Sequence, residues 1–76
     1  MTEMEIRSRI ELALPGSRVS VRDTTGTGDH FEAVVEASQF TGKSMIEQHR
    51  MIYDALGTAV GGAIHALALR TSNLRT

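Results

Sequence analysis

The side chains best suited to chemistry in this sequence are its three histidines, His30, His49 and His65. An imidazole can act as an acid, as a base or as a metal ligand near neutral pH. His30 follows a glycine-rich segment, which predicts partial exposure, whereas His49 shares the spacing of an apolar helical stripe, which favours packing. His65 interrupts the most apolar run of the chain. His65 and His30 are therefore the candidates for a functional site, with a structural or solvated histidine as the alternative for each.

The sequence lacks the other common reactive constellations. It contains no cysteine, so the chain alone supplies neither a disulfide nor a thiolate ligand. Two imidazoles on separate elements cannot complete a tetrahedral metal site by themselves. Ser44 is better placed as a helix cap than as a nucleophile, and Gly26-x-Gly28 lacks the following helix of a phosphate-binding loop. We therefore expect a binding domain that is not an enzyme, with a catalytic metal enzyme as the weakest alternative; a soft-metal site would need thiolates from a partner.

Composition limits the chain to one small domain. Its 76 residues leave room for a single core, and a hydrophobic content of 41% is ordinary for a globular domain. A net charge of −1 lacks the basic excess that is typical of proteins held to nucleic acid through phosphates. The chain shows neither a signal-peptide pattern nor the roughly 20 consecutive apolar residues of a membrane helix. We expect a single cytoplasmic domain over residues 1–76 that binds no membrane and forms a monomer or a weak dimer.

Hydrophobic periodicity predicts a helix and then a hairpin in the first half of the chain. Thr2 can cap a helix that extends to Leu14. The apolar face of this helix consists of Ile6, Ile10, Ala13 and Leu14. Strands are expected over residues 19–22 and 31–37, and the turn-forming segment 23–29 between them holds two glycines that can adopt positive φ. A short glycine-containing loop between two strands predicts an antiparallel hairpin.

The second half of the chain predicts one more helix and one more strand. A capping box, Ser44-x-x-Glu47, opens a helix that ends at Gly57. Its apolar stripe consists of Met45, His49, Ile52 and Leu56, with Ile46 and Tyr53 beside it. Residues 58–63 fit either a short helical turn or a loop. The apolar run Ile64–Leu69 predicts a strand that is covered on both faces. The polar residues 70–76 predict a frayed tail. The order α-β-β-α-(turn)-β predicts an α+β fold, with helices on one face of a three-stranded sheet.

Four short motifs follow one another along the chain. They are Gly28-Asp29-His30-Phe31, Phe40-x-Gly42-Lys43-Ser44, His49-Arg50-Met51-Ile52-Tyr53-x-x-Leu56 and Ile64-His65-Ala66-Leu67. In order and spacing they resemble the BolA family, over the stretch from Ile6 to Thr71. One departure is Gln48, where the family commonly has Arg before His-Arg. The resemblance implies a fold similar to a type II KH domain, in agreement with the order of elements expected above.

The resemblance also implies a partner and a cofactor. BolA-like proteins pair with monothiol glutaredoxins around a bridging 2Fe–2S cluster, in iron–sulfur trafficking or iron homeostasis. Glutaredoxin and glutathione supply thiolates, and the histidine at the position of His65 is one of the remaining ligands. The other ligand comes from the loop between the first two strands, where Thr24 to Thr27 offer no good donor and His30 is the candidate. Imidazole can replace thiolate on one iron, as in Rieske-type centres, which fits a chain without cysteine.

A DNA-binding transcriptional regulator is the alternative function. BolA-like proteins are linked to gene regulation, and the segment Lys43–Arg50 resembles the second half of a helix-turn-helix. Lys43, Arg50 and Arg22 would then contact the nucleic acid. The GxxG clamp that KH domains close on backbone nucleotides is absent, and three cations give little affinity at physiological salt. The two functions are compatible if a bound cluster hides or exposes the same surface.

Overall fold

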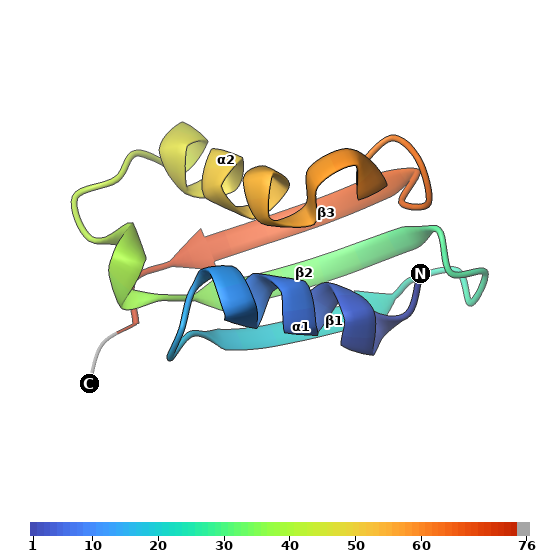
Figure 1. Ribbon diagram of the computed structural model, residues 1–76, viewed down its shortest axis with the longest axis horizontal. Helices are drawn as coiled ribbons and strands as arrows, with labels where there is room; N and C mark the ends of the chain where they lie inside the picture. The colour runs from blue at the N-terminus through green and yellow to red at the C-terminus, as the bar shows by residue number, and fades with distance from the viewer. Residues whose placement is uncertain (75–76) are drawn as a thin grey trace.

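Residues 1–74 are described by a computed structural model, in which helices cover one face of a β-sheet (Figure 1). Along this part of the chain the elements are α1 (Glu3–Ala13), β1 (Arg18–Asp23), β2 (His30–Glu36), α2 (Met45–Leu56) and β3 (Ala66–Ser72), with short 3₁₀ turns η1 (Ser38–Phe40) and η2 (Gly57–Ala59). Within residues 1–74 the sheet has three strands in the order β1-β2-β3. β1 pairs antiparallel with β2, and β2 pairs parallel with β3. The predicted α+β fold and order of elements are confirmed.

Helix α1 begins at a capping box. The Thr2 hydroxyl accepts a hydrogen bond from the Glu5 backbone N–H, and the Glu5 carboxylate accepts one from the Thr2 N–H. Both bonds satisfy donors that a helix start leaves unpaired. Ile6 and Ile10 are fully buried against the sheet, as expected, but Ala13 is exposed. The expectation for Ala13 was wrong because the helix ends there, and Leu14, whose backbone is no longer helical, fills the core in its place.

The predicted hairpin is confirmed, and its alternation defines the two faces of the sheet. Successive side chains of a strand point to opposite faces. On β2, Phe31, Ala33 and Val35 are buried beneath the helices, whereas Glu32 lies on the opposite, outer face. His30 occupies the same outer face at the start of β2. The outer face carries no helix within residues 1–74.

Helix α2 has its predicted capping box, but its buried stripe differs from the expected one. Its buried residues are Gln48, Ile52 and Leu56, whereas Met45 is 57% exposed. Ile46 and Tyr53 are also exposed. The expected stripe was rotated toward Met45 because a glutamine was not placed in the core. Gln48 is buried because its amide Nε2 donates to the Lys43 carbonyl (3.0 Å) and its Oε1 accepts from the Thr71 hydroxyl (2.7 Å).

His49 lies at the margin of this buried stripe and is half-buried. Its Nε2 is buried and has no hydrogen-bond partner among residues 1–74. That position agrees with a role in helix packing and is separate from the contacts made by the other two histidines. His49 therefore does not join a cluster of polar side chains.

Strand β3 starts later and ends later than predicted. Ile64 is fully buried but precedes the strand, which runs from Ala66 to Ser72. Leu67 and Leu69 pack against the core, while Ala66 and Ala68 are exposed. A strand covered on both faces was a wrong expectation, because both helices pack on the same face of the sheet.

The segments that flank β3 also refine the expectations. Residues 58–63, left open between a helical turn and a loop, form the end of η2 and then a turn, with an isolated bridge between Val60 and Ile64. The expected frayed tail began too early, because Arg70 to Ser72 pair with Val34 to Glu36 of β2. Residues 75–76 of that tail lie outside the described residues. Among the described residues, no helix is both long and apolar enough to span a membrane.

Candidate functional site

The fold brings His30 and His65 together at one end of the sheet. His30 is the first residue of β2, and His65 directly precedes β3. The parallel register pairs His30 with Ala66, so the two histidines become neighbours although they lie far apart in the sequence. Their ring centroids are 6.1 Å apart and the rings are nearly perpendicular, at 85°. The His30 side chain is 41% exposed and that of His65 63%, so a partner could reach both.

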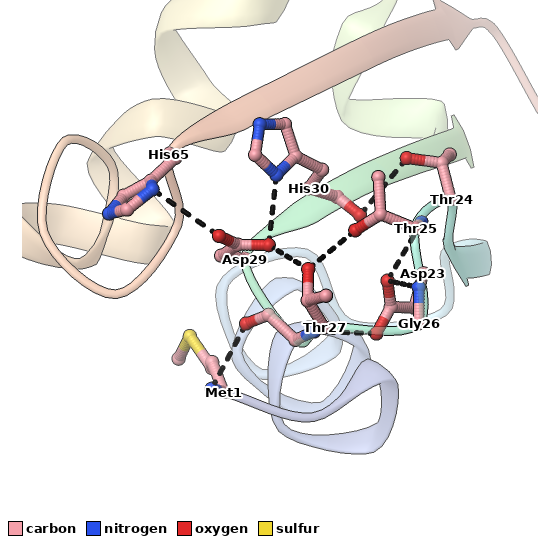
Figure 2. A network of polar contacts seen from close by, with 10 residues as sticks. Met1, Asp23, Thr24, Thr25, Gly26, Thr27, Asp29, His30 and His65 are labelled. Atoms are coloured by element: carbon pink, nitrogen blue, oxygen red, sulfur yellow. Dashed lines mark hydrogen bonds and ion pairs between the residues drawn. The ribbon is translucent and has the colours of Figure 1, made fainter.

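The carboxylate of Asp29 lies between these two rings (Figure 2). Asp29 Oδ1 is 2.8 Å from His30 Nδ1, and Oδ2 is 3.3 Å from His65 Nδ1. The Thr27 hydroxyl also donates to Oδ1. One acidic side chain therefore contacts both candidate histidines through the same ring nitrogen of each.

The backbone of Asp29 joins the same two segments. Its carbonyl accepts hydrogen bonds from the backbone N–H groups of His65 (2.7 Å) and Ala66 (3.2 Å). These bonds fix the segment before β3 to the end of the loop that leads into β2. The distance between His30 and His65 is thus set by main-chain pairing as well as by side chains.

Hydrogen bonding strengthens the preference of Asp29 for its ionised form. Its contacts lower the pKa of Asp29 to about 2, and the bond donated by Thr27 is the largest cause, followed by the contact with His30. Partial burial acts in the opposite direction but is outweighed. At neutral pH the site therefore contains a carboxylate anion between two imidazoles.

A tight loop positions Asp29 and His30. The Asp23 carboxylate accepts backbone hydrogen bonds from Thr25, Gly26 and Gly28 at 2.8 to 3.2 Å. Burial alone would raise the pKa of Asp23, but these donors leave it below its usual value. Both glycines adopt φ of +76°, as expected from the sequence, a conformation that side chains with a Cβ rarely take. The loop is thus held by its own backbone and by Asp23.

The threonines of this loop serve as hydrogen-bonding groups within it. The Thr24 hydroxyl donates to the His30 carbonyl, and the hydroxyls of Thr25 and Thr27 bond to each other. The Met1 ammonium group donates to the Gly28 carbonyl from the other side (Figure 2). His30 is therefore the imidazole that this loop presents beside His65.

The ring nitrogens that remain for a ligand are the Nε2 atoms. Nδ1 of each ring faces Asp29, and within residues 1–74 neither Nε2 of His30 nor that of His65 has a hydrogen-bond partner. No group of three or more His, Cys, Asp or Glu side chains in this part of the chain has the arrangement of a metal-binding cluster. The site offers two exposed imidazole donors on a shared carboxylate.

Asp29 is the residue to which the sequence analysis assigned no role. It stood in the motif Gly28-Asp29-His30-Phe31, but the motif pointed to the histidine. An acid directly before a histidine is a weak signal in a sequence. Its contact with His65 depends on the parallel pairing of β2 with β3, which no local pattern indicates.

The three cations proposed for nucleic-acid binding are not gathered on one surface. Lys43 and Arg50 are exposed, in the loop before α2 and on α2 itself. Arg22 lies on the outer face of β1, opposite the helices, and pairs with Glu32 at 3.3 Å. Within the described residues, the element before α2 is the three-residue turn η1 and not a second helix. The segment around Lys43–Arg50 therefore does not form a helix-turn-helix with the segment that precedes it.

The fold and site together define a small α+β domain that presents two histidines at one end of a mixed sheet. A family model described as BolA-like protein matches residues 8–75. A bolA protein homologue from Coxiella burnetii is similar in structure, with 43% identity, a TM-score of 0.76, and coverage of 93% of this chain and 88% of the homologue. The chain belongs to the BolA family.

Two curated relatives extend this comparison. Human BolA-like protein 1 is 33% identical over 75 residues, which cover 90% of this chain and 55% of the human protein. The Escherichia coli protein named DNA-binding transcriptional regulator BolA is 38% identical over 50 residues, which cover 66% of this chain and 48% of that protein. The chain thus spans about half the length of these two relatives.

Proposed function

We propose that this protein binds a 2Fe–2S cluster jointly with a monothiol glutaredoxin and acts in iron–sulfur trafficking or iron homeostasis. His65 and His30 are the proposed ligands from this chain. The observation that carries the proposal is their juxtaposition: two exposed imidazoles, 6.1 Å apart between ring centroids, lie on adjacent segments at one end of the sheet. Membership of the BolA family supports the same function.

The donor set suits a cluster that is shared with a thiol-bearing partner. Each iron of a 2Fe–2S cluster takes two ligands besides the bridging sulfides, and two histidines can replace two cysteines on one iron. This chain has no cysteine, so the thiolates come from glutaredoxin and from glutathione. The cluster is the cargo that the two proteins carry between them. This chain contributes the imidazoles and the surface that surrounds them.

The position of the site allows a partner to approach without opening the core. His65 lies in the bend before β3, and His30 lies on the outer face, which is free of helices within residues 1–74. Beneath the site, Phe31 of β2 and Ile64, which precedes β3, are almost fully inaccessible. Main-chain bonds from Asp29 to the segment before β3 hold the site in place. The site is therefore an exposed feature on a rigid support.

An anaerobic transfer experiment tests this function. The protein is mixed with a cluster-loaded monothiol glutaredoxin that contains glutathione, and visible absorption and circular dichroism are recorded. We expect a new spectrum at a one-to-one ratio, reduced by His30→Ala and abolished by His65→Ala. His49→Gln serves as the matched control, because His49 lies apart from the site on α2. An unchanged spectrum with the wild-type protein, or an identical change with His65→Ala, would contradict the proposal.

DNA binding is the second candidate function. The similarity to the Escherichia coli protein named as a DNA-binding regulator and the exposure of Lys43 and Arg50 favour it. The separation of Arg22 and a net charge of −1 weigh against it. A mobility-shift titration at about 150 mM salt tests it, because non-specific phosphate contacts weaken steeply with salt. Sequence-selective binding that Lys43→Ala and Arg50→Ala both weaken would support regulation, and binding that vanishes at this salt would exclude it.

A further inference from the structure

The arrangement around Asp29 determines which nitrogen of each histidine carries a proton. An ionised carboxylate has only acceptor oxygens, so a ring nitrogen that is hydrogen-bonded to it donates. A ring nitrogen that lies close to the carboxylate without such a bond is more stable with its proton than with its lone pair facing the negative charge. Oδ1 is hydrogen-bonded to His30 Nδ1 at 2.8 Å, whereas Oδ2 lies 3.3 Å from His65 Nδ1, a close electrostatic contact without hydrogen-bond geometry. A neutral imidazole carries its single proton on one of two nitrogens. If that proton is on Nδ1, the lone pair is on Nε2.

We infer that Asp29 is a positioning residue that holds both His30 and His65 as Nδ1–H tautomers and so presents Nε2 of each ring to a metal. This inference rests on the proposed function for the identity of the metal, and on the geometry for the tautomers. Histidines that ligate metals commonly donate their other ring N–H to a carboxylate, which fixes both the tautomer and the orientation of the ring. The feature that distinguishes this site is that one carboxylate serves two histidines.

The side chain of Asp29 has no comparable task in holding the fold. The backbone carbonyl of Asp29 already accepts the two N–H bonds that tie the segment before β3 to the loop. The carboxylate itself is partly exposed and contacts Thr27, His30 and His65 rather than the core. Replacing it with an amide leaves the main-chain bonds in place. The histidine tautomers should therefore respond to the substitution while the fold remains.

Long-range ¹H–¹⁵N correlation spectra of the metal-free protein test the tautomers. The spectra are recorded over a pH series, and the tautomers are read where each ring carries a single nitrogen-bound proton. We expect both His30 and His65 to show a protonated Nδ1 and an unprotonated Nε2. A predominantly Nε2–H tautomer at either residue would overturn the inference. The measurement uses the wild-type protein, so it does not depend on whether a variant folds.

The variant Asp29→Asn supplies the second measurement. An amide has one oxygen that accepts and a nitrogen that only donates, so it can hold at most one of the two rings in the Nδ1–H form. At least one histidine should therefore change to a mixed or Nε2–H state. Asp54→Asn is the matched control, because the Asp54 side chain is exposed on α2 and makes no hydrogen bond or ion pair within residues 1–74. Unchanged tautomers at both histidines in Asp29→Asn would overturn the inference.

Cluster transfer then separates this inference from the function on which it rests. If the wild-type protein accepts no cluster, the proposed function fails, whereas the tautomer spectra still decide what Asp29 does. If the wild-type protein accepts it, Asp29→Asn should bind about 10- to 100-fold more weakly, as is typical when the partner of a ligating histidine is removed. Asp54→Asn should bind as the wild type does. Equal affinity of Asp29→Asn and wild type would show that Asp29 does not position the ligands.

Discussion

The buried side chain of Gln48 permits a quantitative prediction about what holds α2 against the sheet. Gln48 is 9% exposed and bridges the Lys43 carbonyl and the Thr71 hydroxyl through two hydrogen bonds. Each such bond contributes about 1 kcal/mol net, and a buried methylene about 0.8 kcal/mol. Gln48→Ala should therefore lower the free energy of unfolding by about 3 kcal/mol. Urea unfolding followed by far-ultraviolet circular dichroism measures this change.

A double-mutant cycle isolates the contact with β3. Thr71→Val removes the hydroxyl and leaves Gln48 Oε1 without that donor, so it should cost about 1 to 2 kcal/mol. The two substitutions should be coupled by about 1 kcal/mol, because they share one hydrogen bond. A loss below about 0.5 kcal/mol for Gln48→Ala, the range of ordinary surface substitutions, would refute the reasoning. The tautomers of His30 and His65 should be unaffected in the folded variants, since Thr71 lies at the far end of β3.

Three further predictions concern local features of the chain. Ser44→Ala removes the cap of α2 and should cost about 1 kcal/mol in urea unfolding, and a change within about 0.2 kcal/mol would contradict the assigned cap. The pKa values of Glu47 and Glu5 are lowered, chiefly by hydrogen bonds from the backbone N–H groups of Ser44 and Thr2, so their stabilising effect is present at neutral pH. Stability should therefore fall as the pH drops below about 4.3, the usual Glu value, through the lower folded-state pKa. A pH titration of thermal unfolding in which Glu47→Gln shows as steep a fall as wild type would argue against the contribution of Glu47. Gly26→Ala adds a Cβ at a residue whose φ is +76°, and this Cβ would have no other atom within 4 Å. The substitution should therefore cost about 1 kcal/mol of stability from backbone strain alone. Thermal unfolding measures this cost, and an unchanged stability would refute backbone strain at this position.

The order of the elements could be predicted from the sequence because its signals are local. Capping at Thr2 and Ser44, glycines in the hairpin loop and the alternation of β2 each depend on a few neighbouring residues. These features were confirmed, as was the packing of both helices on one face. The parallel pairing of β3 with β2 also explains the late end of β3 at Ser72, because pairing extends a strand into residues that look like a polar tail.

The features that escaped prediction depend on contacts between distant segments. The oxygen of the buried Gln48 amide is satisfied by Thr71, which is 23 residues away in the sequence. Asp29 joins His30 and His65 only because β3 returns parallel to β2 and places its first residues beside the loop. A sequence pattern shows which residues are polar, but it does not show which of them meet. For the same reason, His30 and His65 could be named as candidates while the carboxylate between them could not.

Nitrogen hyperfine spectroscopy of the cluster complex tests the central claim most directly. The protein is labelled with ¹⁵N-histidine, combined with an unlabelled monothiol glutaredoxin, and the reduced 2Fe–2S cluster is examined by pulsed electron paramagnetic resonance. Couplings from two ligating ¹⁵N nuclei are predicted for the wild-type protein, and one of them should disappear in His30→Ala. A cluster that forms in the complex without ¹⁵N coupling, or one that keeps both couplings in His30→Ala and in His65→Ala, would contradict the assignment of these histidines as ligands.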